Sequence, residues 1–145
     1  MTGFRKAALL AYLASACGAV LGGILYLSRS EFLPYHGEAV GMPWQSVPVN
    51  SRVLFLALIH VVGALGISLG CAVITMIVIP FRRAEPWADW IIPVVLLMAQ
   101  LAGLRVTLEV AAKTGAHAPW EAVLAGVLTT VLGTAFCWAA RIRRA

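Results

Sequence analysis

Four long apolar stretches, separated by short polar segments, constrain the fold of this chain more than any other feature of its sequence. They cover residues 7–28, 53–79, 86–112 and 119–140. A helix needs about 20 mostly apolar residues to cross the hydrocarbon core of a bilayer, and each stretch is long enough. Only 12% of the residues are charged, against about 25% in soluble domains. The sequence therefore predicts an all-α membrane protein, a single four-transmembrane-helix bundle over residues 1–145.

The segment between the first two stretches, residues 29–51, is the longest polar part of the chain. Its prolines prevent one continuous helix, and its aromatic side chains suit the headgroup zone of a membrane. We expect a short interfacial helix at residues 34–40 that ends at Gly41. Asn50 or Ser51 is expected to cap the second membrane helix, because a short polar side chain satisfies N–H groups at a helix start.

The lysines and arginines concentrate on one side of this four-span topology. Seven lie in the N-terminal head, the second connection and the C-terminal tail, against three in the other two connections. Lys and Arg concentrate in loops that stay in the cytoplasm, so both termini are predicted to be cytoplasmic. Because these charges fall at the ends of spans and form no single basic face, we expect no nucleic-acid partner. The seven are Arg5, Lys6, Arg82, Arg83, Arg141, Arg143 and Arg144, and the three are Arg29, Arg52 and Lys113.

Two charges inside the third stretch are the strongest indication of a site. Arg105 and Glu109 lie four residues apart, so they share a helix face and can pair. A charge within a membrane span is costly, usually faces the protein interior and suggests a function. In the predicted topology, His60 on the second helix lies at a depth similar to that of Arg105, so the two could meet. Tyr35 and His36 belong to the first outer loop, on the same side of the membrane.

These five residues form the candidate ligand-binding set: Tyr35, His36, His60, Arg105 and Glu109. They would line a polar pocket near the outer leaflet, where the planar guanidinium would bind the anionic or carbonyl head of a lipid-like amphiphile. Two alternatives without a ligand stay open. Arg105 and Glu109 could neutralise each other and fix the helix orientation, or Arg105 could extend to the headgroups.

No cofactor is expected, because the sequence lacks CxxC, GxGxxG, Walker and GxSxG motifs. A zinc or copper site from His36, His60, His117 and a carboxylate would need ligands from separate elements, since no paired histidine spacing exists. We therefore expect no metal site. Bis-histidine haem would need two histidines inside the membrane, and only His60 lies there. The three cysteines fall in apolar spans and are expected to be small buried hydrophobic side chains: Cys17, Cys71 and Cys137.

Three short segments carry a resemblance to known proteins. Phe32–His36 (FLPYH), Ile79–Arg83 (IPFRR) and Pro119–Trp120 resemble segments of small, uncharacterised four-helix integral membrane proteins found widely among bacteria. The resemblance covers most of the chain and implies a four-span fold in a bacterial inner (cytoplasmic) membrane. It carries no catalytic residues over.

For function, we expect a small non-enzymatic membrane protein whose partners are membrane lipids and which holds a lipid-like ligand. One alternative is a homo-oligomer or a subunit or accessory protein of a larger membrane complex, because small residues four apart let helix backbones approach closely. The other is a small membrane enzyme acting on an amphiphile, with His60 or Glu109 as a proton carrier. The small-residue repeats are Ala14, Gly18 and Gly22 in the first helix and Gly66 and Gly70 in the second.

Overall fold

The structure is a computed structural model that describes residues 3–142, a range built of helices and loops without a β-strand. Four of the helices in this range are long and apolar enough to cross a membrane, which confirms the predicted all-α class and the four long apolar helices. Arg143 and Arg144, counted in the charge bias, lie outside the described residues. The four helices are α1 (Gly3–Leu27), α3 (Val49–Met76, continued by the π-helical turn η2, Ile77–Phe81), α4 (Ala88–Thr114) and α5 (Trp120–Ile142).

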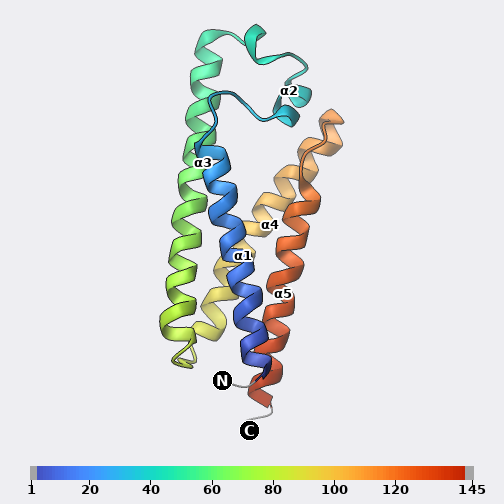
Figure 1. Ribbon diagram of the computed structural model, residues 1–145. Coiled ribbons are helices and arrows are strands. Elements are labelled where there is room, and N and C mark those ends of the chain that lie inside the picture. The colour runs from blue at the N-terminus through green and yellow to red at the C-terminus, as the bar shows by residue number, and fades with distance from the viewer. Residues whose placement is uncertain (1–2, 143–145) are drawn as a thin grey trace.

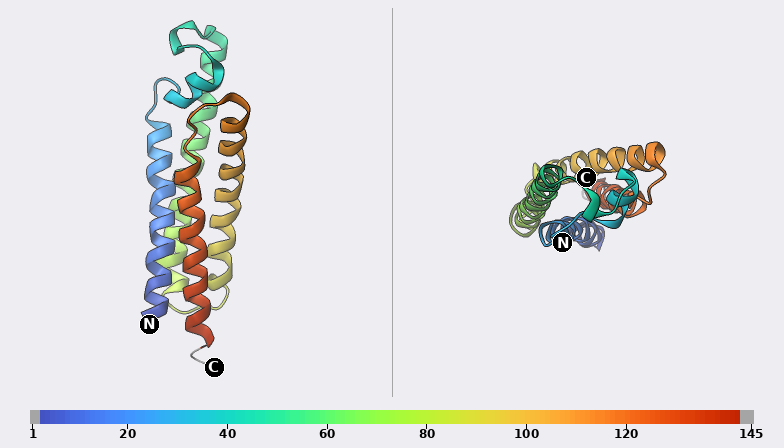
Figure 2. Two further views of the ribbon diagram at one scale, coloured as in Figure 1. Left: turned by 90° about the vertical axis from the view of Figure 1, so that its right-hand side faces the viewer. Right: turned by 90° about the horizontal axis from the view of Figure 1, so that it is seen from above.

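Helix α1 lies between α3 and α5 and packs along both. Helix α4 packs against α5, so that the spatial order is α3, α1, α5, α4 (Figure 1, Figure 2). Helices α3 and α4 meet near the short turn that joins them and diverge toward the opposite end (Figure 1). We call the end with this turn, the start of α1 and the end of α5 the turn end. The opposite end, with the first polar loop, is the loop end.

Close contact between α1 and α3 depends on glycines. A Cβ added to Gly23 would lie 2.6 Å from the carbonyl O of Gly63, and one added to Gly70 would lie 2.8 Å from that of Ala16. The two backbones therefore approach as closely as small residues allow in a membrane protein. By contrast, a Cβ at Gly18 or Gly22 would meet no atom within 4 Å. The glycine repeat of α3 packs inside the bundle, whereas that of α1 lies on an uncovered face.

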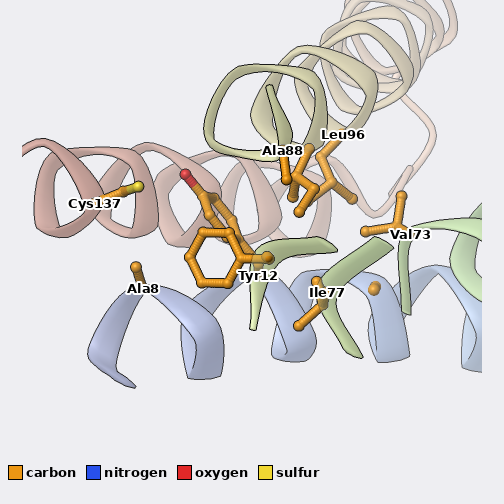
Figure 3. Close-up of a cluster of buried hydrophobic side chains, with 10 residues drawn as sticks. Ala8, Tyr12, Val73, Ile77, Ala88, Leu96 and Cys137 are labelled. Atoms are coloured by element: carbon orange, nitrogen blue, oxygen red, sulfur yellow. The ribbon is translucent and has the colours of Figure 1, made fainter. Parts of the chain in front are cut away.

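The hydrophobic core gathers at the turn end, where all four long helices contribute (Figure 3). Tyr12 and Phe81 pack edge to face there, with 5.7 Å between ring centres. Helix α4 contributes to this core only through its first turns, since no residue of α4 after Leu96 is buried. The loop-end half of α4 therefore lies at the edge of the bundle. The buried cluster comprises Ala8, Tyr12, Ala16, Val73, Ile77, Phe81, Ala88, Ile92, Leu96 and Cys137.

The first polar loop contains the short helix α2 (Pro34–Val40) and a 3₁₀ turn, η1 (Trp44–Ser46). Helix α2 ends at Gly41, whose positive φ of 73° suits glycine, so its predicted bounds are confirmed. The predicted cap at Asn50 or Ser51 is wrong, because α3 already begins at Val49. Pro48 precedes it in an extended conformation, and the fixed φ of proline lets the helix start at the next residue.

Candidate functional site

The predicted pair of Arg105 and Glu109 does not form. Glu109 instead pairs with Lys113, and both side chains are largely exposed. Lys113 also lies four residues away, and Glu placed N-terminal to Lys is the favourable order for such a helix pair. Arg105 lies on an exposed face of α4, in the half that diverges from α3 and carries no buried residue. The prediction that Arg105 faces the bundle interior is therefore wrong.

The other three predicted residues lie at the loop end, in separate contacts. Nε2 of His60 lies 2.8 Å from the carbonyl O of Arg29, just after α1. The hydroxyl of Tyr35 lies 2.7 Å from that of Tyr26, and burial raises the pKa of Tyr35. No hydrogen bond or ion pair within residues 3–142 joins His60 to Arg105 or Glu109.

His36 stabilises the start of α2. The backbone N–H of Leu33 donates to Nδ1 of His36 at 3.3 Å, so this nitrogen is an acceptor and carries no proton. The ring packs beside those of Tyr26, Phe32 and Tyr35. Burial among these groups lowers the pKa of His36 below its usual value. In this structure His36 therefore caps the start of α2.

A single carboxylate links the two loops of the loop end. Oε2 of Glu38 accepts the backbone N–H of His117 at 2.8 Å and lies 3.1 Å from Nδ1 of the same residue. The backbone hydrogen bond is the main reason why the pKa of Glu38 lies below its usual value. Within residues 3–142, no three His, Cys, Asp or Glu side chains are close enough together to hold a metal ion.

One of the five predicted residues, Glu109, borders a hollow at this end. A shallow hollow of about 290 Å³ lies on α4. Among the predicted residues, it is lined by Glu109 alone, and all its lining residues belong to one helix: Val106, Glu109, Val110, Lys113 and Thr114. A surface formed by a single helix cannot enclose a ligand, so this hollow is a weak candidate for a site.

The turn end contains a buried ion pair that joins the start of α1 to the start of α4. Nη2 and Nη1 of Arg5 donate to the two carboxylate oxygens of Asp89, at 2.9 and 3.4 Å. Nη2 also donates to the carbonyl O of Phe81 at 2.8 Å, and the guanidinium lies 4.2 Å from the centre of that ring. Only 3% and 6% of the Arg5 and Asp89 side chains are exposed. Because buried charges need paired, hydrogen-bonded partners, this contact ties α1, η2 and α4 together.

Arg141, near the end of α5, is a second cation beside the same carboxylate. Its Nε lies 3.6 Å from Oδ2 of Asp89, and its guanidinium lies 5.8 Å from the ring centre of Trp90. Its side chain is 38% exposed. Among the described residues, its terminal amino groups have no hydrogen-bond partner. Arg141 can therefore donate to a further acceptor.

A cavity of about 460 Å³ lies between α4 and α5, beside the ion pair. Its volume falls within the roughly 300–1,000 Å³ of small-molecule sites. Asp89 and Arg141 line it at the turn end, and its other walls are mostly apolar. Trp90 and Trp138 border it with exposed rings, so it opens toward the outside of the bundle. The lining residues are Asp89, Trp90, Leu97, Val131, Thr134, Ala135, Cys137, Trp138 and Arg141.

A layer of hydroxyl and amide groups crosses the bundle beyond this ion pair. The fully buried Thr130 of α5 donates to Oε1 of Gln100 on α4 at 2.9 Å, and its hydroxyl lies 3.0 Å from that of Ser15 on α1. The Tyr12 hydroxyl donates to Thr134, which also lines the cavity, at 3.2 Å. These contacts hold α1, α4 and α5 in register and so fix the inner wall of the cavity.

Sequence reasoning missed this turn-end site because it assigned each charge a different role. Arg5 and Arg141 were counted as topology signals, and Asp89, at the start of the third apolar stretch, was given no role. One signal pointed to the site: Asp89 and Glu85 are the only acidic residues near several cations at this end. A carboxylate at the start of an apolar span, among arginines from two other spans, is a natural partner for one of them.

The cysteines divide between the interior and the outer surface of the bundle. Cys137 is buried and borders the cavity, as predicted for a small hydrophobic side chain. Cys17 and Cys71 are exposed on their helices, so the prediction that they are buried is wrong. The cause is the same for both: they lie on helix faces that no other helix covers.

Taken together, the turn-end groups can hold an elongated molecule with a polar head and an apolar body. Arg141 supplies unused donors at one end of the cavity, and apolar side chains supply most of the remaining walls.

No model of a protein family matches this chain, and neither a curated protein nor a solved structure matches it.

Proposed function

We propose that this protein is a non-enzymatic membrane protein that binds a lipid-like amphiphile in the cavity between α4 and α5. One observation carries the proposal: a largely apolar cavity on the outer side of two membrane helices ends at a partly exposed arginine. An amphiphile has the matching distribution of polar and apolar surface. The ligand class is the one expected from the sequence, but the cavity lies at the turn end and not among the five predicted residues.

The state of the polar groups favours binding over catalysis. Within residues 3–142, Asp89 is the only carboxylate that lines the cavity, and both of its oxygens are engaged by arginines. The hydroxyl of Thr134 donates to the carbonyl O of Thr130. A general base or nucleophile must reach the reacting atom, and neither group is placed to do so.

A blocking substitution tests the binding proposal. Val131→Trp would fill the cavity, whereas Leu132→Trp adds the same bulk at the neighbouring position, which does not line it. Purified wild-type protein and the Leu132→Trp variant should retain lipid in native mass spectrometry after mild detergent extraction, and Val131→Trp should lose it. Equal retention by all three proteins, with matching thermal melts, would rule out the cavity as the binding site.

We further propose a bacterial inner membrane location with both termini in the cytoplasm, which would place the turn end on the cytoplasmic side. The charge bias of the loops supports this orientation. Reporter fusions after Ala145 and near Ala84 should report the cytoplasm, and a fusion near Gly41 should report the opposite side. Signals from Ala84 and Gly41 on the same side would contradict the orientation and the four-span topology.

A second candidate function is that of a subunit in a larger membrane assembly. The observation in its favour is the uncovered face of α1, where Ala14 is exposed and nothing lies close to Gly18 or Gly22. Small residues on a lipid-facing helix allow close packing with another helix. A partner that stays bound in mild detergent and is lost in Gly18→Leu would support this function. Protein that is monomeric and free of partners under the same conditions would argue against it.

A further inference from the structure

We infer that the amphiphile is a phospholipid whose anionic phosphate lies against Arg141 and whose acyl chain lies along α4 and α5. The inference rests on the proposed function, because it assigns a ligand to the same cavity. It adds the chemical class of the lipid headgroup, the direction of the acyl chain and the residue that selects the headgroup. Each of these follows from a separate property of the cavity.

The length of the cavity matches one leaflet of a bilayer. Its lining runs from Asp89 to Leu97 on α4, about 12 Å at 1.5 Å per residue, and from Val131 to Arg141 on α5, about 15 Å. Half of a hydrocarbon core of about 30 Å is about 15 Å. An acyl chain that starts at Arg141 would therefore end near the middle of the membrane. A soluble anion would leave most of this length unfilled.

The charged end of the cavity lies where a lipid head would lie. Arg141 is in the last turn of α5, and Asp89 is in the first turn of α4. Trp90 and Trp138 border the cavity near the same end and are 52% and 60% exposed. Trp side chains are enriched where the hydrocarbon core meets the headgroups, so these two rings mark that depth. A lipid that enters from the side would thus bring its phosphate to the level of Arg141.

The side chains at this end favour an anionic head over a zwitterionic one. Arg141 is the exposed charged group of the lining, and its terminal amino groups are free to donate within the described part of the chain. A guanidinium binds phosphate through two parallel N–H···O bonds. Asp89, the group that could attract a choline cation, is only 6% exposed and already faces Arg5. Among the described residues, the cavity therefore offers an open donor for a phosphate, whereas its carboxylate is already engaged and Arg141 would repel an ammonium group placed beside it.

The test compares two lipids with identical chains, phosphatidylglycerol and phosphatidylcholine, titrated into delipidated full-length protein and followed by native mass spectrometry. Wild-type protein should bind phosphatidylglycerol about tenfold more tightly, because both lipids offer a phosphate to Arg141 but only phosphatidylcholine brings a second cation beside that guanidinium. Arg141→Gln should bring the two affinities close to each other. Arg83→Gln removes the same charge from the exposed turn at the same end, away from the cavity lining, and should keep the preference.

Two further variants separate the possible failures. Arg141→Lys keeps the charge beside Asp89 but loses the planar fork, so it should bind both lipids several-fold more weakly and still prefer phosphatidylglycerol. An unchanged preference in Arg141→Gln would overturn the inference while leaving the proposed function intact. If Arg141→Gln does not fold, the Lys variant decides, because affinities equal to those of the wild type would overturn the inference. If Val131→Trp binds both lipids like the wild type, the cavity is not the site, and the proposed function fails with the inference.

Discussion

The carbonyl O of Gly63 lies 2.6 Å from the position that a Cβ on Gly23 would occupy, so these two glycines set the distance between α1 and α3. Gly23→Ala should force the helices apart and destabilise the protein by about 1–3 kcal/mol, the usual cost of overpacking. Gly22→Ala is the matched control, because nothing lies within 4 Å of its added methyl group. Thermal melts in detergent compare the two, and equal melting temperatures would contradict the close contact.

Thr130 should be the most sensitive residue of the polar layer. Thr130→Val keeps the shape of the side chain but removes the hydrogen bond to Gln100 and the contact with Ser15, at 2.9 and 3.0 Å. We expect a loss of about 0.6–2 kcal/mol, the range for hydrogen bonds between membrane helices. Thr129→Val is the control, since the exposed Thr129 bonds only to the carbonyl O of Ala125 in its own helix. Denaturation curves of the two variants should differ, and identical curves would show that the layer adds no stability.

Asp89 should tolerate substitution only together with Arg5. Asp89→Asn leaves Arg5, which is 3% exposed, without its carboxylate partner. Removing one member of a buried pair costs about 3–5 kcal/mol, whereas replacing both with apolar groups is often neutral. Combining Arg5→Met with Asp89→Leu should therefore recover most of the loss in a thermal melt. Glu85→Gln, a carboxylate in the nearby turn, should melt like the wild type. A double variant no more stable than Asp89→Asn would contradict this account.

The start of α2 should open in mild acid. Because burial holds the pKa of His36 below 6.5, the folded loop favours the neutral ring and the unfolded loop takes up a proton first. The contribution to stability is thus complete above 6.5 and declines as the pH falls below that value. The protection factor of the Leu33 amide, which donates to His36, should fall over that range in a hydrogen-exchange measurement. His36→Gln keeps an acceptor and cannot titrate, so its exchange should show no such step, and a step that persists would point to another group.

Periodicity and composition were enough to predict the parts of the fold that depend on local sequence. The four spans and α2 follow from runs of apolar residues and from residues that end helices, such as Gly41. The start of α3 was predicted too late because a polar cap at Asn50 or Ser51 was expected. The helix instead begins at Val49, directly after Pro48, whose φ is fixed. The order of the helices could not be predicted, since it depends on which glycines face each other, and the repeats of α1 and α3 look alike in the sequence.

The candidate site was misplaced for a related reason. A charge deep in an apolar stretch was taken as interior, but α4 has no buried residue after Leu96, and Arg105 lies on its exposed face. Sequence distance hid the turn-end site, because Arg5 and Asp89 are 84 residues apart and meet only through the packing of α1 against the end of α3. Spacing within one helix can be read from a sequence, but a contact between distant helices requires the tertiary fold.

The separation of 84 residues between Arg5 and Asp89 also has a consequence for biosynthesis. Ribosomes add about 5–20 residues per second, so Arg5 emerges about 4–17 s before its partner. During that interval Arg5 is present before Asp89 has been made, and its long side chain near the helix end can extend toward a polar surface. Arg141 is made later still, 52 residues after Asp89. The cavity between α4 and α5 is therefore completed only once α5 has been made, so any ligand that it holds must enter after that step, from outside the bundle.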